Sequence, residues 1–359
     1  MLELFEKKTE CFGCEACVAV CPQKVIVMKR DGEGFAYPAI EEERCIDCGM
    51  CEEICPHKHP LLAVEPRAYA VRCNDIDVLY RSTSGGAFSL IASCILREGG
   101  LVCGAVFDDD FQVVHVLSDD IHPMRKAKYV QSSIGNCFLE MEETLKAGRE
   151  VLFSGTPCQC HGVKRLFGKH PGLLLVSIIC RGVQSPALWE EYRRWLEKDG
   201  VLSAFCFRDK RRLNDAHTVS WTVGGEENEA LYQKDPFCRF FAKELSLRPA
   251  CYHCPYCRPE KDFDFTIGDF WGIEQFLPEL ADGKGTSLVL AGSESARRIM
   301  EEIRTSARVW EAEPEQYMQE SLRAPAKEPF LRKFFYKDFQ QKGADGVCNM
   351  ELLLKKYGS

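Results

Sequence analysis

The chain has 359 residues, of which 45% are hydrophobic and 28% are charged, and its formal net charge is -8. This composition is typical of a globular protein and excludes disordered and fibrous classes, and the length predicts two or three domains. Neither end carries a long basic run, and no apolar stretch is long enough to span a bilayer, so neither nucleic acid nor a membrane is expected as a partner. The first residues lack the basic and apolar regions of an export signal, so we expect a cytoplasmic protein. In a reducing compartment, 21 cysteines indicate metal binding or redox chemistry rather than disulfides.

Two runs of four cysteines repeat near the N-terminus, each with the spacing C-x2-C-x2-C-x3-C-P. This spacing wraps three thiolates around one 4Fe-4S cluster and sends the fourth cysteine to the other cluster. The predicted ligand sets are Cys11, Cys14, Cys17 and Cys55 for the first cluster, and Cys45, Cys48, Cys51 and Cys21 for the second. Small residues at Gly13, Ala16 and Gly49 would let backbone N-H groups point at the sulfides. The alternative, a pair of structural zinc sites, is disfavoured because zinc motifs rarely continue with x2-C and x3-C-P.

Short strands are predicted at 24–28 and 35–40, around a turn at Asp31-Gly32. This ferredoxin unit is expected to end near residue 65. The first 60 residues contain seven Lys or Arg and twelve Asp or Glu, a formal charge of -5. An acidic face of this kind would suit a basic redox partner, although ordinary solvated surface charge explains it equally well.

From about residue 68, apolar runs alternate between strand and helix patterns. Strands are predicted at 101–107, 111–117, 151–153 and 173–179, and helices are expected after Gly86, Gly135, Gln159 and Pro186. This alternation favours an α/β domain with a largely buried sheet, following an α+β ferredoxin-type domain. The predicted domains are 1–65, 66–300 and a mainly helical C-terminal extension at 301–359, with a proline-rich break at 324–329.

The larger region carries a series of short motifs in one order. They are Ser82-Thr83-Ser84-Gly85-Gly86-Ala87, Lys128-Tyr129-Val130-Gln131-Ser132, Phe153 to Gln159, Cys180 to Pro186, Phe207-Arg208-Asp209-Lys210, Cys251 to Cys254 and Ile267 to Gly272. The series resembles the beta subunit of coenzyme F420-reducing hydrogenases and dehydrogenases, a family in which a ferredoxin module can precede this domain. One departure is Cys180-Arg181-Gly182, where members commonly have Cys-His-Gly.

The resemblance implies an iron-sulfur flavoprotein whose larger domain binds FAD and a third 4Fe-4S cluster. The ligands carried over by position are Cys158, Cys180, Cys251 and Cys254, with Cys257 and Cys160 as competing candidates. By spacing alone, the C-x2-C-x2-C run that starts at Cys251 could equally be part of a zinc site.

A flavin site is also supported by the loop that precedes the apolar residues 88–96. Its glycines and small hydroxyl residues would let a pyrophosphate approach backbone N-H groups at a helix N-terminus, although such a loop taken alone could be an ordinary helix cap. Gly155 and Thr156 follow a predicted strand, at the sheet edge where α/β proteins bind ligands. The residues expected to bind FAD are Ser82, Thr83, Ser84, Gly85, Gly86, Lys128, Gln131, Gly155, Thr156, Gln159 and Arg181. No catalytic residue is predicted.

The function implied by the resemblance is an oxidoreductase that passes electrons between 4Fe-4S clusters and FAD. Its partners would be ferredoxin or another redox protein and a small-molecule donor or acceptor, such as coenzyme F420 or an unidentified organic substrate. A second hypothesis is a non-catalytic electron-transfer subunit of a larger redox complex, with a possible link to polysaccharide biosynthesis. A third is a cluster-bearing redox sensor or assembly scaffold.

Overall fold

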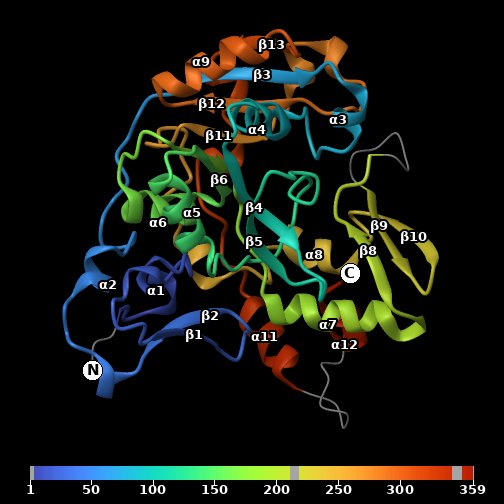
Figure 1. Ribbon diagram of the computed structural model, residues 1–359. Helices are drawn as coiled ribbons and strands as arrows, with labels where there is room; N and C mark the ends of the chain where they lie inside the picture. The colour runs from blue at the N-terminus through green and yellow to red at the C-terminus, as the bar shows by residue number, and fades with distance from the viewer. Residues whose placement is uncertain (1–3, 211–217, 342–349, 359) are drawn as a thin grey trace.

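The computed structural model describes residues 4–210, 218–341 and 350–358. Figure 1 shows a small N-terminal unit packed beside one end of a larger unit, which is built on a long central sheet. A second, smaller sheet lies on the opposite side of the larger unit from the N-terminal helices. The chain is thus a mixed α/β protein with a small N-terminal unit that contains both cysteine runs.

The small unit consists of one β-hairpin and two short helices, with one helix in each cysteine run. Its elements are α1 (Ala16–Val20), β1 (Ile26–Arg30), β2 (Ala36–Ile40) and α2 (Met50–Glu53), with single 3-10 turns at Lys8–Glu10 and Glu42–Arg44. The two strands pair antiparallel, with Ile26 opposite Ile40. Asp31 Oδ1 accepts hydrogen bonds from the backbone N-H groups of Glu33 and Phe35, each at 3.0 Å, and so closes the turn. The predicted hairpin is present, and its first strand begins two residues later than expected.

The central sheet has eight strands in the order β13-β3-β12-β11-β7-β6-β4-β5. The strands are β3 (Arg67–Cys73), β4 (Leu101–Phe107), β5 (Val113–Ser118), β6 (Val151–Gly155), β7 (Leu173–Ile178), β11 (Phe265–Asp269), β12 (Ser287–Ala291) and β13 (Ala307–Ala312). Strands β4, β6, β7 and β11 are parallel to their neighbours in this set, whereas β5, β12 and β13 pair antiparallel. The four predicted strands are β4 to β7. Strand β13 extends the same sheet past residue 300, the predicted domain boundary.

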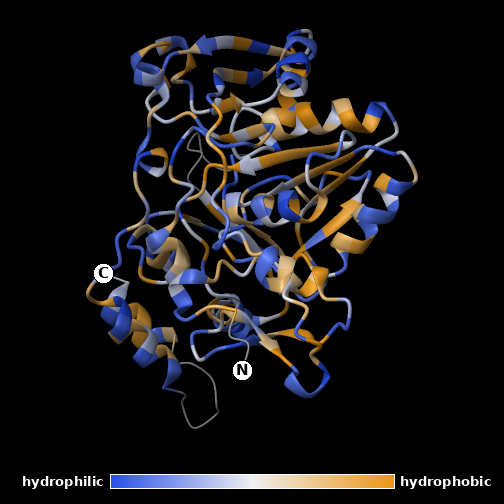
Figure 2. Ribbon diagram, turned by 90° about the vertical axis from the view of Figure 1, so that its left-hand side faces the viewer, coloured by the Kyte–Doolittle hydropathy of each residue, from blue (hydrophilic) through white to orange (hydrophobic). Residues whose placement is uncertain are grey.

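Helices cover both faces of the central sheet. Helices α4 (Ala87–Arg97) and α9 (Glu294–Ile303) bury apolar residues on one face, while α5 (Cys137–Lys146) and α6 (Pro157–Phe167) cover β4, β6 and β7 on the other. Figure 2 shows hydrophobic residues along the strands and on the helices that flank them. Helix α6 begins two residues before Gln159, because Thr156 and Gln159 form a capping box around Pro157. The short helices α3 (Ile76–Tyr80) and α10 (Pro314–Tyr317) lie in connecting segments.

A second, three-stranded sheet was not predicted from the sequence. It has the order β10-β9-β8 and is accompanied by four helices around an aromatic core. Its elements are α7 (Pro186–Leu196), β8 (Leu202–Cys206), β9 (Thr218–Val223), β10 (Glu226–Leu231), α8 (Pro236–Ala242), α11 (Arg332–Gln340) and α12 (Met350–Tyr357). The extension predicted at 301–359 contains strand β13 of the central sheet, and the described residues after it include the helices α10, α11 and α12. Within the described ranges, no helix is both long and apolar enough to cross a membrane.

The hairpin of the small unit is held against the larger unit by a partly buried ion pair and close backbone packing. Glu33 accepts two hydrogen bonds from the Arg332 guanidinium, at 2.9 and 2.6 Å. Gly34, at φ +84°, lies so close to α7 that an added Cβ would sit 2.2 Å from the Cβ of Ala187. Ser185 Oγ, at the start of α7, donates to the carbonyl oxygen of Glu33 at 2.5 Å. The hairpin therefore fits its position only with glycine at its tip.

We expect the substitution G34A to destabilise the protein more than the same change at Gly148. Gly148 has a similar φ of +77° but no neighbour within 4 Å, so G148A adds only backbone strain of about 1 to 2 kcal/mol. At Gly34 the collision with α7 adds overpacking of about 1 to 3 kcal/mol. Anaerobic urea unfolding followed by tryptophan fluorescence measures both variants. Equal unfolding midpoints for the two variants would show that the hairpin tip is not packed as described.

Candidate functional site

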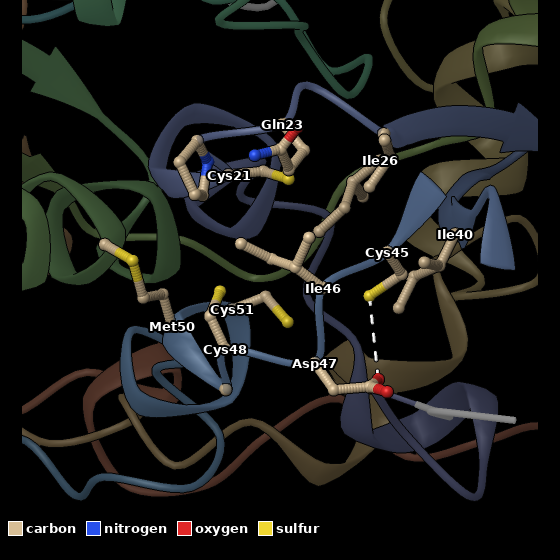
Figure 3. Close-up of a pocket in the computed structure, with 13 residues that line it drawn as sticks. Cys21, Gln23, Ile26, Ile40, Cys45, Ile46, Asp47, Cys48, Met50 and Cys51 are labelled. Carbon is tan, nitrogen blue, oxygen red and sulfur yellow. Dashed lines mark hydrogen bonds between the residues drawn. The ribbon is translucent and has the colours of Figure 1, made fainter. Parts of the chain in front are cut away.

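The eight N-terminal cysteines line two adjacent cavities. One has an empty volume of ≈ 440 Å³ and is lined by Cys11, Cys14, Cys17 and Cys55, and also by Cys51. The other has an empty volume of ≈ 390 Å³ and is lined by Cys21, Cys45, Cys48 and Cys51. Figure 3 shows these last four side chains gathered around the second cavity, with Ile26, Ile40 and Ile46 beside them. The structure thus brings together both predicted sets, including the cysteine that crosses over from each run.

The backbone of the two cysteine runs also repeats. Gly13 and Asp47 occupy equivalent positions and both have positive φ, at 67° and 49°. Glu15 and Gly49 are the next equivalent pair, at 62° and 74°. Alternating left-handed residues turn successive backbone N-H groups toward one side, which is how short loops bind anionic groups. The loops therefore suit the sulfides of a cluster as well as its iron atoms.

The two cavities differ in their exposure. At the first, Cys14 is buried, and its loop faces the larger unit through Gln131, whose amide nitrogen donates to the carbonyl oxygens of Phe12 and Gly13 at 3.3 Å. At the second, Cys48 is exposed and the neighbouring Ile46 is 58% exposed. The second cavity is therefore the outer one and the first is the inner one.

A single-ion site is not formed by these residues. In the parts of the chain that the structure describes, no three His, Cys, Asp or Glu side chains converge as they would around one metal ion. The thiolates of a 4Fe-4S cluster bind different iron atoms, so they lie farther apart than the ligands of one zinc ion.

A third group of cysteines lies in the larger unit. Cys158 is in the first turn of α6, Cys180 follows β7, and Cys251 and Cys254 lie in and just after the 3-10 segment Pro249–His253. The four are electrostatic neighbours of one another, and burial raises the pKa of Cys158 to about 11 and that of Cys251 to about 12. The four thiols thus come from three segments and lie in one region of the larger unit, and their role as ligands of a third cluster stays a prediction.

The competing candidates lie differently. Cys257 is hydrogen-bonded to Cys254, and this bond lowers the pKa of Cys257 while it raises that of Cys254. Cys160 is fully buried under the central sheet, and its Sγ is 3.7 Å from the carbonyl oxygen of Gly155. Cys257 therefore adjoins the third group, whereas Cys160 belongs to the apolar core beside Phe153 and Val163.

The third group lies next to the inner cavity. Cys14 and Cys158 are electrostatic neighbours, and an added Cβ on Gly162 of α6 would lie 3.2 Å from Cys14 Sγ. Tyr256 packs between the two groups: its ring is 5.5 Å from that of Phe12, and its hydroxyl is 2.8 Å from His161 Nδ1. Neither Tyr256 nor His161 was predicted from the sequence. The three cysteine groups therefore form a row from the surface into the larger unit.

A large cleft lies at the carboxyl edge of the central sheet. Its empty volume is ≈ 1370 Å³, including the part that opens to solvent. The predicted residues that line it are Ser82, Thr83, Ser84, Gly86, Lys128, Gly155, Thr156, Gln159 and Arg181. Cys180 lines it as well, so the cleft adjoins the third cysteine group. This is the position at which parallel α/β sheets bind ligands.

Two residues expected in the flavin site do not line the cleft. Gly85 packs against the sheet, where an added Cβ would lie 2.1 Å from the carbonyl oxygen of Val71. Gln131 instead binds the first cysteine loop with its amide nitrogen and accepts a hydrogen bond from Arg248 at 2.9 Å. Within the motif Lys128 to Ser132, Lys128 therefore faces the cleft, whereas Gln131 faces the small unit.

The loop from Ser82 to Gly86 is fixed by its own hydroxyl groups. Ser82 Oγ donates to the Val78 carbonyl oxygen at 2.7 Å, and Ser84 Oγ donates to that of Thr286 at 2.7 Å. Gly86, at φ +90°, is the N-cap of α4 and provides no side-chain cap. The N-terminus of this 11-residue helix lies at the cleft, because Gly86, Ala87 and Phe88 all line it, and the N-H group of Ala87 donates to Ser287 Oγ at 3.5 Å.

The charged residues around the cleft are mainly basic. Arg125, Lys126, Lys128 and Arg181 line it, whereas Asp269 is the acidic side chain in its lining. Burial lowers the pKa of Lys128 to about 8, and the nearby Lys126 acts in the same direction. Arg181 is held at the rim by ion pairs with Glu244 and Glu320. The cleft is therefore suited to an anionic ligand.

His115 is a cleft residue that was not predicted from the sequence. It lies on β5, stacked on Phe153 with ring centroids 5.1 Å apart, and its Nε2 is 3.1 Å from the carbonyl oxygen of Ser154. Burial lowers the pKa of His115 to about 4, so the imidazole is neutral at physiological pH. The available signal was a histidine within an otherwise apolar strand, Val113 to Val116.

Known protein families match both parts of the chain. Residues 10–59 match the 4Fe-4S dicluster domain. Residues 148–317 match the C-terminal domain described as coenzyme F420 hydrogenase/dehydrogenase, beta subunit. No curated protein sequence matches the chain.

Solved structures also include similar chains. One is from the F420-reducing NiFe hydrogenase complex of Methanosarcina barkeri, solved as a xenon derivative. It is 15% identical, the match covers 82% of this chain and 98% of that chain, and the TM-score is 0.48. From the two family matches, the chain is an iron-sulfur redox protein related to coenzyme F420 hydrogenase and dehydrogenase beta subunits, with an N-terminal 4Fe-4S dicluster domain.

Proposed function

We propose that this protein is an iron-sulfur flavin-dependent oxidoreductase, which exchanges single electrons at its surface and electron pairs in the cleft. The observation that carries the proposal is that the third cysteine group adjoins the basic cleft. Cys180 belongs to the third cysteine group and also lines the basic cleft at the carboxyl edge of the sheet. FAD bound in this cleft would supply two-electron chemistry, while 4Fe-4S clusters carry one electron at a time.

The residues of the cleft fit an anionic dinucleotide. The N-H groups at the start of α4 and the cations Lys126 and Lys128 would bind its phosphates. Gly104 and Gly155 line the cleft, and His115 contributes a neutral imidazole there. The proposed third-cluster ligands are Cys158, Cys180, Cys251 and Cys254, with Cys257 as the alternative to Cys254.

The proposed substrate is a small molecule such as coenzyme F420, and the proposed one-electron partner is ferredoxin or another redox protein. The cleft opens to solvent in the single chain, which favours direct access of a small substrate. A pure electron-transfer subunit would instead cover this opening with a partner. Exposure of Cys48 at the outer cavity favours exchange with a redox protein there.

We expect about twelve iron and twelve sulfide ions per chain in the anaerobically reconstituted protein, because three 4Fe-4S clusters bind. The variant C158A should lower both values to about eight, since only the N-terminal pair would remain. The matched control is C94A, because Cys94 is a buried thiol bonded to the Leu90 carbonyl oxygen in α4. A wild-type content of about eight would remove the third cluster from the proposal.

FAD affinity should fall as the pH rises above about 8. Lys128 has a pKa of about 8, so its charge, which would bind the phosphates, is present below that pH and is lost above it. The dissociation constant should therefore rise up to about tenfold between pH 7 and pH 9. Fluorescence quenching of FAD measures this dependence.

The variant K128R is the control for this pH dependence, because a guanidinium stays charged over the whole range. Its affinity for FAD should be nearly constant between pH 7 and pH 9, while K128M should bind weakly at both values. The same pH dependence in K128R as in the wild type would rule out Lys128 as its source.

Reduced coenzyme F420 and reduced ferredoxin should each bleach the flavin of the anaerobic protein. Bleaching by both donors is expected from an enzyme that joins a one-electron and a two-electron site. Stopped-flow absorbance with each donor separately makes the measurement. Bleaching by ferredoxin alone would favour the electron-transfer subunit, and a protein that retains no flavin would favour the redox sensor.

A further inference from the structure

Arg248 is a buried cation between the small unit and the larger unit. It is 1% exposed, and its guanidinium reaches the first cysteine run from the loop that leads to Cys251. Nε donates to the carbonyl oxygen of Cys11 at 2.8 Å, and Nη2 donates to that of Ala36 at 3.0 Å and lies 3.5 Å from Cys11 Sγ. Its face lies 4.2 Å from the ring centroid of Tyr37. All of these partners other than the sulfur are neutral.

Within the described part of the chain, the charge of Arg248 has no counter-ion. Among the residues that the structure describes, no carboxylate lies within ion-pair distance of its guanidinium. The second buried arginine of the same interface, Arg332, is 5% exposed and is paired with Glu33 at 2.6 Å. A buried charge without a partner is strongly unfavourable. A neutral Cys11 thiol does not offset it, but a thiolate bound to a cluster does.

The second cysteine set has the opposite electrostatic setting. Cys45 Sγ lies 3.7 Å from Asp47 Oδ1, and this pair is exposed. A carboxylate beside a cluster disfavours the added electron, and a cation favours it. The two N-terminal sites, which have the same ligands and the same loop geometry, therefore differ in the charge next to a ligand sulfur.

We propose that Arg248 is the counter-charge of the inner cluster, bound by Cys11, Cys14, Cys17 and Cys55, and raises its reduction potential above that of the outer cluster. It is a positioning and tuning residue and takes no part in chemistry itself. Electrons that arrive at the exposed outer cluster would then be drawn inward, toward Cys158. This inference rests on the dicluster domain alone and is independent of the flavin.

The neutral variant R248Q tests the proposal when the clusters of the anaerobic protein are titrated with EPR detection. We expect the midpoint potential of one cluster to fall by at least 59 mV, which is a tenfold change in its redox equilibrium. The other N-terminal cluster should be unchanged, and R248K, which keeps the charge, should show less than half of the shift. The proposal is wrong if R248Q moves the potential of neither N-terminal cluster or moves both equally.

The control is the double variant E33Q/R332Q, which removes the neighbouring buried ion pair without leaving one charge unpaired. It loosens the same interface, so a purely structural effect would shift the potential here as well. We expect both potentials to stay at their wild-type values. A shift as large as that of R248Q would overturn the assignment to charge.

A second measurement needs no substitution. In wild-type protein labelled with ¹⁵N-arginine, pulsed ENDOR of the reduced clusters should detect one guanidinium nitrogen coupled to the cluster of higher potential. Because Arg248 Nη2 is the arginine nitrogen found at a predicted ligand sulfur in the described part of the chain, the coupling identifies it. No coupling, or coupling to the cluster of lower potential, would overturn the proposal even if R248Q does not fold.

Discussion

The close approach of helix α1 to helix α6 is the contact on which the rest of the arrangement depends. Gly162 makes it possible, because any side chain there would push against Cys14 Sγ and the Cβ of Ala16 at 3.2 and 3.4 Å. The contact brings the first cysteine loop beside Cys158 at the start of the same helix. The small unit is therefore fixed to the larger unit with one cysteine group against another, while its second group faces solvent.

The docking surface is held by buried charges as well as by packing. Arg332 and Glu33 form a complete pair, which positions the hairpin but has no cysteine sulfur among its partners. Glu15 reaches in the other direction, accepting hydrogen bonds from the N-H groups of Ile134 and Gly135 at 3.0 and 2.8 Å. Arg248 lies between these contacts with no carboxylate partner in the described residues. An interface that needed only stability would pair this charge, so its position beside Cys11 points to a role toward the cluster.

The sequence predicts features that depend on residues near one another in the chain. The cysteine spacing, the hairpin around Asp31 and strands β4 to β7 are local patterns of this kind, and each is found in the structure. Residues that act across the fold gave no such pattern: Arg248, Tyr256 and Gly162 look ordinary until the small unit is docked. Gln131 shows the same limit, because it lies three residues from Lys128 but faces the opposite side of the chain. Strands β12 and β13 were not predicted. Each pairs antiparallel with β3, which is distant in the sequence, and no local pattern indicates such a pairing.

Two turns of the central sheet connect the cleft to the cysteine groups. At the end of β6, Gly155 and Thr156 line the cleft. The capping box between Thr156 and Gln159 fixes the first turn of α6, which contains Cys158. Thr156 Oγ1 lies 3.1 Å from Cys158 Sγ, so the same side chain touches both sites. After β7, Cys180 both lines the cleft and belongs to the third cysteine group. Because neighbouring parallel strands end at the same edge, ligand-binding glycines and cysteines can alternate within a few residues there. A group bound in the cleft would thus lie next to the two turns that carry Cys158 and Cys180 of the third cysteine group.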